Sequence, residues 1–281
     1  MDPLRSVIFV DGRNLWYNLR EFRFQTESGK EVGRDYRLDE KHFCWGPFFA
    51  GVLQKFDELA GVNHRLLRAY WYNVESLTRF TRWDEGAVRI LERHRAEYPE
   101  LTEERIHELA EDWHRRQAEN LRKARDEVYE EIQRKTNFLE FKYVGLAFVN
   151  AYNVSRLSTS GEGELQYAGT WKGEKGVDTG MAVDMVSKMK EYDVAILVSG
   201  DADFIPVVRY LKDNLKQVYQ FSLARGVPPR ITYLSAWLRS IVDVFAYFDE
   251  VELLSKYLDS KFRFPPEVRQ AIESRIAELK G

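Results

Sequence analysis

Two short apolar runs, each followed at once by acidic residues, constrain the fold of this chain more than any other feature. Residues 6–10 have the sequence SVIFV and are followed by Asp11, and residues 194–198 have the sequence VAILV and lead into SGDAD at 199–203. Such short runs, rich in β-branched residues, are typical of buried strands in a parallel sheet. Other strand and helix patterns alternate with them along the chain. The sequence therefore predicts an α/β fold with a mainly parallel sheet covered on both faces.

Hydrophobic periodicity and turn residues predict the remaining elements. Helices are expected after residue 15 and over 43–59, 178–189, 204–211, 233–239 and 265–280, and strands over 66–72, within 138–149 and over 216–221. Residues 155–176 are polar and contain five glycines, so we expect a mobile loop with a small hairpin. For residues 242–248 the pattern leaves helix and strand open.

One segment holds much of the charge of this chain. Charged residues make up 31% of the 281 residues, but about half of those between Asp84 and Lys135. From Thr102 onward, apolar residues recur there at intervals of three, four or eight, which predicts an amphipathic helix about 50 Å long. We therefore expect a domain over residues 1–250, interrupted by a charged helical insertion at 84–136 and followed by a helical tail at 251–281. The apolar stripe of the insertion is expected to pack on its own domain or on a partner, so a homodimer is one alternative.

Charge and cysteine content exclude several classes of protein. The formal net charge of −3 excludes a uniformly basic nucleic-acid binder, although a locally basic face stays open. The single cysteine, Cys44, excludes a disulfide scaffold and a zinc site built from several thiolates. We see no apolar stretch long enough for a membrane helix and no signal-peptide pattern, so we expect a soluble cytoplasmic protein that does not bind a membrane.

Acidic residues gather where a parallel sheet binds its ligands, beyond the carboxyl ends of the strands. Asp11, Asp201 and Asp203 follow the two buried strands, and Asp178 opens a helix after the glycine-containing segment. Asp184 lies six residues further, off the face of Asp178 if both are helical. Carboxylates brought together repel one another and need a cation or shared protons. Oxygen ligands without thiols or histidines favour Mg²⁺ or Mn²⁺, the ions used in phosphoryl chemistry.

Each aspartate also has a simpler interpretation. Asp203 and Asp178 are suited to cap helices, Asp11 suits a turn before Gly12, and Asp184 suits a solvated helix position. The sequence alone leaves both interpretations open, and their shared position at one rim favours a site. No G-x-G-x-x-G, G-x-x-x-x-G-K-[ST], H-E-x-x-H or G-x-S-x-G motif occurs, and the five histidines avoid the rim segments. These absences argue against nucleotide-binding loops and histidine-based catalysis.

Three sequence blocks then resemble the signature of a known family. V-D-G-R-N-L at 10–15, K-G-V-D at 175–178 and S-G-D-A-D-F-I-P at 199–206 are similar to the blocks of the NYN domain, of the PIN-like nuclease superfamily. The resemblance covers roughly residues 5–225. It implies a PIN-like three-layer α/β/α sandwich and a metal-dependent ribonuclease. The metal ligands that it implies are Asp11, Asp178, Asp201 and Asp203, with Asp184 and Asn14 at or beside the site.

Positive and aromatic residues are candidates for holding RNA. Arg13, Lys172 and Lys175 are close in sequence to the acidic residues, and with Asn14 and Ser199 they form the expected substrate-binding set. Trp171 and Tyr167 are candidates for base stacking, as is the segment from Arg65 to Arg95, in which seven arginines alternate with aromatic residues. Ordinary packing and ion pairs with the many glutamates are the alternatives.

The function predicted from these features is metal-dependent hydrolysis of RNA phosphodiester bonds by an endoribonuclease. Two alternatives stay open. One is a catalytically silent RNA-binding or adaptor protein of the same fold. The other is a phosphatase-like hydrolase that uses the acidic rim on small substrates.

Overall fold

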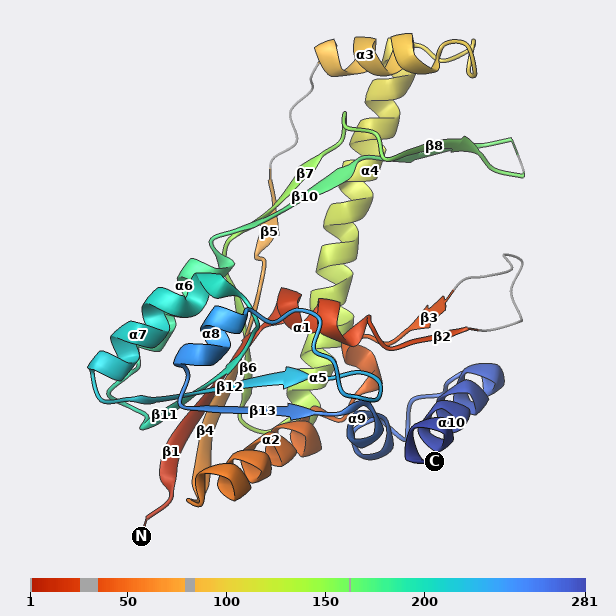
Figure 1. Ribbon diagram of the computed structural model, residues 1–281. Helices are drawn as coiled ribbons and strands as arrows, with labels where there is room; N and C mark the ends of the chain where they lie inside the picture. Colours follow the sequence, from red (N-terminus) through yellow and green to blue (C-terminus); the bar gives the residue numbers. More distant parts are fainter. Residues whose placement is uncertain (1, 26–34, 79–83, 162) are drawn as a thin grey trace. The chain divides into compact units, whose positions relative to one another are not determined.

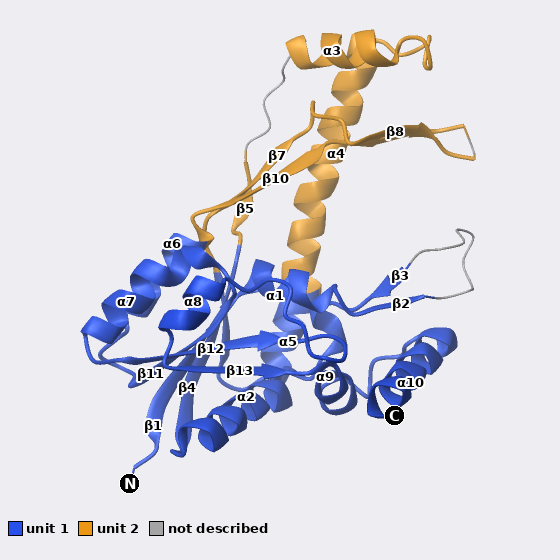
Figure 2. Ribbon diagram, in the orientation of Figure 1, with its two compact units in different colours: residues 1–73, 128–142, 178–281 blue, residues 74–127, 143–177 orange. Residues whose placement is uncertain are grey.

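The computed structural model describes residues 2–25, 35–78, 84–161 and 163–281. The chain divides into two compact units (Figure 2). The first unit comprises residues 1–73, 128–142 and 178–281, and the second comprises 74–127 and 143–177. The second unit thus shares residues with the predicted insertion at 84–136, but it also contains the strands that follow that segment.

A six-stranded sheet forms the centre of the first unit, in the order β13-β12-β11-β1-β4-β6 (Figure 1). Neighbouring strands from β13 to β4 are parallel. The strand bounds are β1 (Leu4–Asp11), β4 (His64–Asn73), β6 (Leu139–Tyr143), β11 (Val194–Val198), β12 (Gln217–Leu223) and β13 (Val244–Phe248). The two strands that the apolar runs predicted, β1 and β11, lie side by side in the middle, where both faces are covered.

Helices cover both faces of this sheet, which is consistent with the expected PIN-like α/β/α sandwich. Figure 1 shows α2 on one side of the sheet and α6 and α7 on the other. The helices are α1 (Gly12–Leu19), α2 (Trp45–Ala60), α5 (Glu130–Lys135), α6 (Val177–Ser187), α7 (Ile205–Asp213), α8 (Ala236–Ile241), α9 (Glu250–Lys256) and α10 (Pro266–Lys280). The unit also contains the 3₁₀ turns η1 (Glu40–His42) and η3 (Ala202–Phe204). A small hairpin is formed by β2 (Arg23–Gln25) and β3 (Asp35–Arg37). Aromatic rings pack between α2 and the sheet. There Phe48 of α2 contacts Phe221 of β12 and Phe248 of β13 edge to face.

The second unit has its own core. Its elements are β5 (Ser76–Leu77), α3 (Asp84–His94), α4 (Glu103–Lys123), β7 (Leu146–Asn150), β8 (Arg156–Thr159), β9 (Leu165–Ala168) and β10 (Thr170–Lys175). Ile106, Ala110 and Trp113 of α4 are buried with Tyr152 and Tyr167. The amphipathic stripe predicted for this helix is therefore confirmed at its N-terminal end. Beyond Lys123 the chain stays helical through a π-helical turn, η2 (Ala124–Tyr129), and α5.

Several sequence predictions need correction. The loop expected over residues 155–176 is wrong: β8 and β9 form the expected hairpin, but β10 is a further strand that pairs with β7. Its polar composition misled the prediction, because three of its six residues are exposed and none is fully buried. Residues 138–149 form two strands, because Gly145 turns the chain with a φ of 72°. Helix α8 begins at Ala236 after the Ser235 cap, and 242–248 holds β13.

Among the described residues, no helix is both long enough and apolar enough to span a membrane.

Candidate functional site

The carboxyl ends of β1 and β11 bring the first pair of site residues together. The register places Val10 opposite Val198, so Asp11 and Ser199 leave the sheet next to each other. The Ser199 hydroxyl donates a hydrogen bond of 2.8 Å to Asp11 Oδ2. The other carboxylate oxygen of Asp11 accepts from the backbone N–H of Asn14 at 3.0 Å and caps α1. Both side chains are almost fully buried, so their mutual hydrogen bond satisfies polar atoms that water does not reach.

A chain of hydrogen bonds holds the loop of residues 199–203. The backbone N–H of Gly200 donates to Asn14 Oδ1 at 3.2 Å, and that of Asp201 donates to Ser199 Oγ at 3.1 Å. The N–H of Asp203 then donates to Asp201 Oδ1 at 3.0 Å. The loop is therefore positioned by the start of α1 and by its own hydroxyl, which leaves the carboxylates of Asp201 and Asp203 facing outward.

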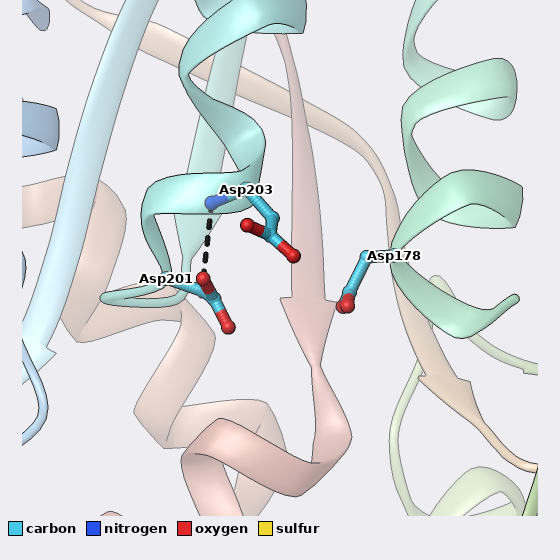
Figure 3. Close-up of side chains that lie close together, drawn as sticks. All are labelled: Asp178, Asp201 and Asp203. Atoms are coloured by element: carbon cyan, nitrogen blue, oxygen red, sulfur yellow. Dashed lines mark hydrogen bonds between the residues drawn. The ribbon is translucent and has the colours of Figure 1, made fainter. Parts of the chain in front are cut away.

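Three carboxylates converge above this loop (Figure 3). Asp178, in the first turn of α6, provides an oxygen that lies with oxygens of Asp201 and Asp203 within 4.8 Å of one another. Asp178 is half-buried, whereas Asp201 and Asp203 are exposed. We call these residues the acidic trio. All three come from the first unit, from segments that the sheet order brings to one rim.

The electrostatics of the acidic trio are unfavourable without a counterion. Burial, followed by repulsion from Asp11, Asp201 and Asp203, raises the pKa of Asp178 to about 6. The ordinary pKa of an aspartate is 3.8, so at neutral pH the folded protein holds this charge at a cost. A cation between the three carboxylates would relieve the repulsion. The donors are all carboxylate oxygens, and no thiol or imidazole belongs to the trio, so these residues fit Mg²⁺ or Mn²⁺.

Asp11 and Asp184, which were also expected to bind metal, occupy different positions. Asp11 lies close enough to affect the pKa of Asp178, but it is not one of the three convergent side chains. Asp184 accepts hydrogen bonds from the Tyr72 hydroxyl at 2.8 Å and from Lys188 Nζ at 2.7 Å. Although burial raises the pKa of Asp184, these two donors hold it below its usual value. The structure therefore does not bring Asp184 into the trio.

The cap interpretations also change. The residue that caps η3 is Asp201, while Asp203 lies inside that turn. Asp201 thus has two roles to fill, because one of its oxygens accepts from the Asp203 N–H. Asp178 lies in the first turn of α6, where the N-terminal end of the helix favours a negative charge. Asp178 is therefore not the cap of α6, whereas Asp201 combines capping with membership of the trio.

The expected substrate-binding residues are divided between the two units. Arg13 of α1 donates to the Tyr17 hydroxyl at 2.8 Å, while Asn14 and Ser199 support the loop as described above. Lys172 and Lys175 are exposed on β10 of the second unit.

Of the residues expected to stack on bases, Tyr167 is buried and Trp171 is partly exposed. Tyr167 is buried and its hydroxyl donates to the Ala151 carbonyl, so it is a packing residue. Trp171 stays partly exposed, with its indole N–H donating to Gln117 at 3.2 Å. In the segment from Arg65 to Arg95, Trp71 and Tyr72 are fully buried core residues, and residues 79–83 lie outside the described part of the chain. An aromatic surface over this whole segment is therefore wrong.

Two supporting residues escaped the sequence analysis. Gln220 is completely buried on β12 and its Nε2 donates to the Ser199 carbonyl at 2.9 Å. Its only signal in the sequence was a glutamine between the apolar residues Tyr219 and Phe221. Tyr233 was missed as well: its backbone carbonyl lies so close to Gly200 that a Cβ at residue 200 would collide with it.

The fold and the site together define an α/β protein with a carboxylate cluster at the carboxyl ends of its central strands. Residues 115–245 match the family model of the NYN domain, a PIN-like nuclease family, and this confirms the resemblance found in the sequence. The matched range contains Asp178, Asp201 and Asp203 and begins after the segment with Asp11.

The crystal structure of a protein of unknown function from Vibrio parahaemolyticus is 16% identical and covers 92% of this chain and 97% of that chain, with a TM-score of 0.40. The search among curated proteins found no match.

Proposed function

We propose that this protein is a metal-dependent endoribonuclease that hydrolyses RNA phosphodiester bonds at the acidic trio. The convergence of Asp178, Asp201 and Asp203 at the rim of the sheet carries the proposal. The match to a nuclease family supports it, because that match includes all three residues. A cytoplasmic location and a homodimer stay predictions from the sequence.

In this proposal the acidic trio holds Mg²⁺ or Mn²⁺, and the nearby Asp11 carboxylate adds negative charge to the site. When bound, such an ion supplies positive charge that stabilises the phosphate oxygens in the transition state and makes a nearby water molecule more acidic. The chain itself supplies the position of the ligands. Ser199 orients the Asp11 carboxylate, and Asn14 anchors Gly200 so that Asp201 and Asp203 face the same point as Asp178.

Cleavage of RNA in the presence and absence of metal tests the proposal. We expect wild-type protein to cut a labelled RNA in Mn²⁺ or Mg²⁺ and to leave it intact in EDTA. Asp201→Asn should reduce cleavage by more than the roughly 10–100-fold typical of losing a residue that only orients a ligand. Asp213→Asn, at the exposed end of α7, is the matched control and should cleave like wild type. Equal cleavage by wild type and Asp201→Asn would mean that the nuclease activity does not come from this site.

The raised pKa of Asp178 predicts how metal binding depends on pH. A carboxylate binds metal in its ionised form, so protonation of Asp178 below its pKa of about 6 competes with the ion. We expect Mn²⁺ affinity, measured by calorimetry, to rise about tenfold per pH unit below pH 6 and to level off above it. A Mn²⁺ affinity that is the same at pH 5 and pH 7 would contradict this prediction.

Assays of RNA binding, RNA cleavage and aryl phosphate hydrolysis separate the two alternative functions. A silent RNA-binding protein would retain RNA without metal and show no cleavage under any condition. A phosphatase-like enzyme would release phosphate from an aryl phosphate and leave RNA intact. Either result would replace the nuclease proposal.

A further inference from the structure

Exposed aromatic rings with arginines beside them lie next to the loop that carries Asp201 and Asp203. We define the stacking surface as Tyr17 on α1, Tyr233 before α8 and Trp237 on α8, together with Arg13 and Arg209. Tyr17 is 37% exposed and Trp237 is 57% exposed, although large apolar rings are usually covered. All five residues belong to the first unit.

Within this surface, Tyr17 contacts Tyr233 and Arg13, and Trp237 contacts Arg209. The ring centroids of Tyr17 and Tyr233 are 5.7 Å apart. The Arg13 guanidinium carbon lies 5.1 Å from the centroid of the Tyr17 ring, and that of Arg209 lies 5.4 Å from the Trp237 ring. Rings that are held by neighbours lose little freedom when a further ring stacks on them, which favours binding.

Backbone contacts tie this surface to the acidic loop. The Tyr233 carbonyl packs against Gly200, and the N–H of Ser235 donates to the Gly200 carbonyl at 2.8 Å. Tyr17 lies six residues beyond Asp11 in a continuous helix, which corresponds to about 9 Å along the axis. The stacking surface is therefore within a few nucleotides of the acidic trio.

Other side chains anchor the two helices that carry Tyr17 and Trp237, so packing does not explain why these positions are aromatic. Leu15 and Leu19 of α1 are buried and anchor the helix from its opposite face, and the buried Leu238 anchors α8. Tyr233 also donates its hydroxyl to Glu21 at 3.3 Å, but that carboxylate lies 3.6 Å from Arg23 and its charge is partly offset. The surface therefore combines partly exposed rings with two guanidinium groups, those of Arg13 and Arg209.

We propose that the stacking surface holds unpaired nucleobases of the RNA while the neighbouring phosphate reaches the acidic trio. The proposal rests on the nuclease function proposed above. A negatively charged trio cannot by itself attract a polyanion, so the arginines supply phosphate contacts and the rings supply stacking. Bases of a duplex are already stacked on each other and cannot offer their faces, so the surface selects unpaired segments.

Binding measured without cleavage tests this surface. Fluorescence anisotropy of a short labelled RNA without secondary structure is followed in EDTA for the wild type and for single substitutions. We expect Tyr17→Leu and Trp237→Leu to weaken binding about tenfold each, and Tyr17→Phe and Trp237→Phe to retain it, because the aromatic face is kept. Tyr247→Leu on edge strand β13 is the matched control, since Tyr247 is also 37% exposed. The same RNA annealed into a duplex should bind weakly and equally to all variants.

The outcomes separate this inference from the nuclease proposal. If Tyr17→Leu, Tyr233→Leu and Trp237→Leu combined bind unpaired RNA as tightly as wild type, the stacking surface is wrong, whether or not RNA is cleaved. If the binding losses appear but wild type never cleaves RNA in Mn²⁺, the surface stands and the nuclease proposal fails. Equal losses in the leucine and phenylalanine variants would also overturn stacking, because they would indicate a role for the hydroxyl or for local packing.

Discussion

Asp178→Asn is expected to abolish RNA cleavage and, at the same time, to stabilise the metal-free protein. Loss of a trio carboxylate removes a metal ligand, so cleavage should fall beyond the roughly 10–100-fold cost of losing a residue that only orients one. The same change removes a half-buried charge that Asp11, Asp201 and Asp203 repel. Binding sites that tolerate such repulsion often do so for function, at the expense of stability.

The expected gain in stability depends on pH in a defined direction. Because the folded-state pKa of Asp178 is raised from 3.8 to about 6, folding takes up a proton between these values, and the destabilisation is complete above pH 6. Without solvent screening, this pKa shift would correspond to a loss of about 3 kcal/mol in the free energy of unfolding. Because the carboxylate is partly exposed, screening reduces the expected loss to about 1–2 kcal/mol. The variant should therefore melt a few degrees higher than wild type at pH 7.5 and show almost no difference near pH 4.

Thermal melts in EDTA and in Mn²⁺ measure both effects. Wild type should gain stability from Mn²⁺ because the ion binds the folded state, and Asp178→Asn should not. Asp213→Asn again serves as the control and should follow wild type in both conditions. A metal-free Asp178→Asn protein that melts below wild type at pH 7.5 would show that the trio is not under electrostatic strain.

Gly200→Ala is expected to have the second large effect, through shape rather than charge. A Cβ at residue 200 would collide with the backbone carbonyl of Tyr233, which cannot rotate out of the way as a side chain can. The free energy of unfolding should fall by about 1–3 kcal/mol or more. Because the loop carries Asp201 and Asp203, a shift of about 1 Å should also cost roughly 100-fold in cleavage rate.

Gly46→Ala is the matched control for this substitution. Gly46 lies in α2, and no atom of the described residues, apart from its chain neighbours and the backbone of α2 itself, lies within 4 Å of the position that its Cβ would take. There alanine should stabilise the protein by about 0.5–1 kcal/mol, since it favours the helix, and should leave cleavage unchanged. Urea unfolding and single-turnover cleavage of both variants check the pair. If Gly200→Ala unfolds at the same urea concentration as Gly46→Ala, the close approach to Tyr233 is not a constraint.

Local patterns predicted the parts of the fold that repeat within a few residues. The apolar runs that became β1 and β11 and the amphipathic part of α4 are examples, because burial on both faces or on one stripe leaves a periodic signal. Strand β10 was missed because its stabilising contacts are backbone pairs with β7, and its side chains are largely polar. Trp71 and Tyr72 were mistaken for surface residues because nothing in their local sequence shows that α2 covers one face of their strand and α6 the other.

The acidic residues themselves could be found from the chain, since Asp11, Asp201 and Asp203 directly follow recognisable strands and resemble a family signature. Which of them meet could not, because the distance between residues 178 and 201 depends on where α6 starts and on the order of strands in the sheet. Asp184 shows the difference: six residues of helix turn it away from Asp178 and toward Tyr72 and Lys188. Composition and periodicity describe what each segment buries, whereas the site arises from segments far apart in sequence that packing brings to one rim.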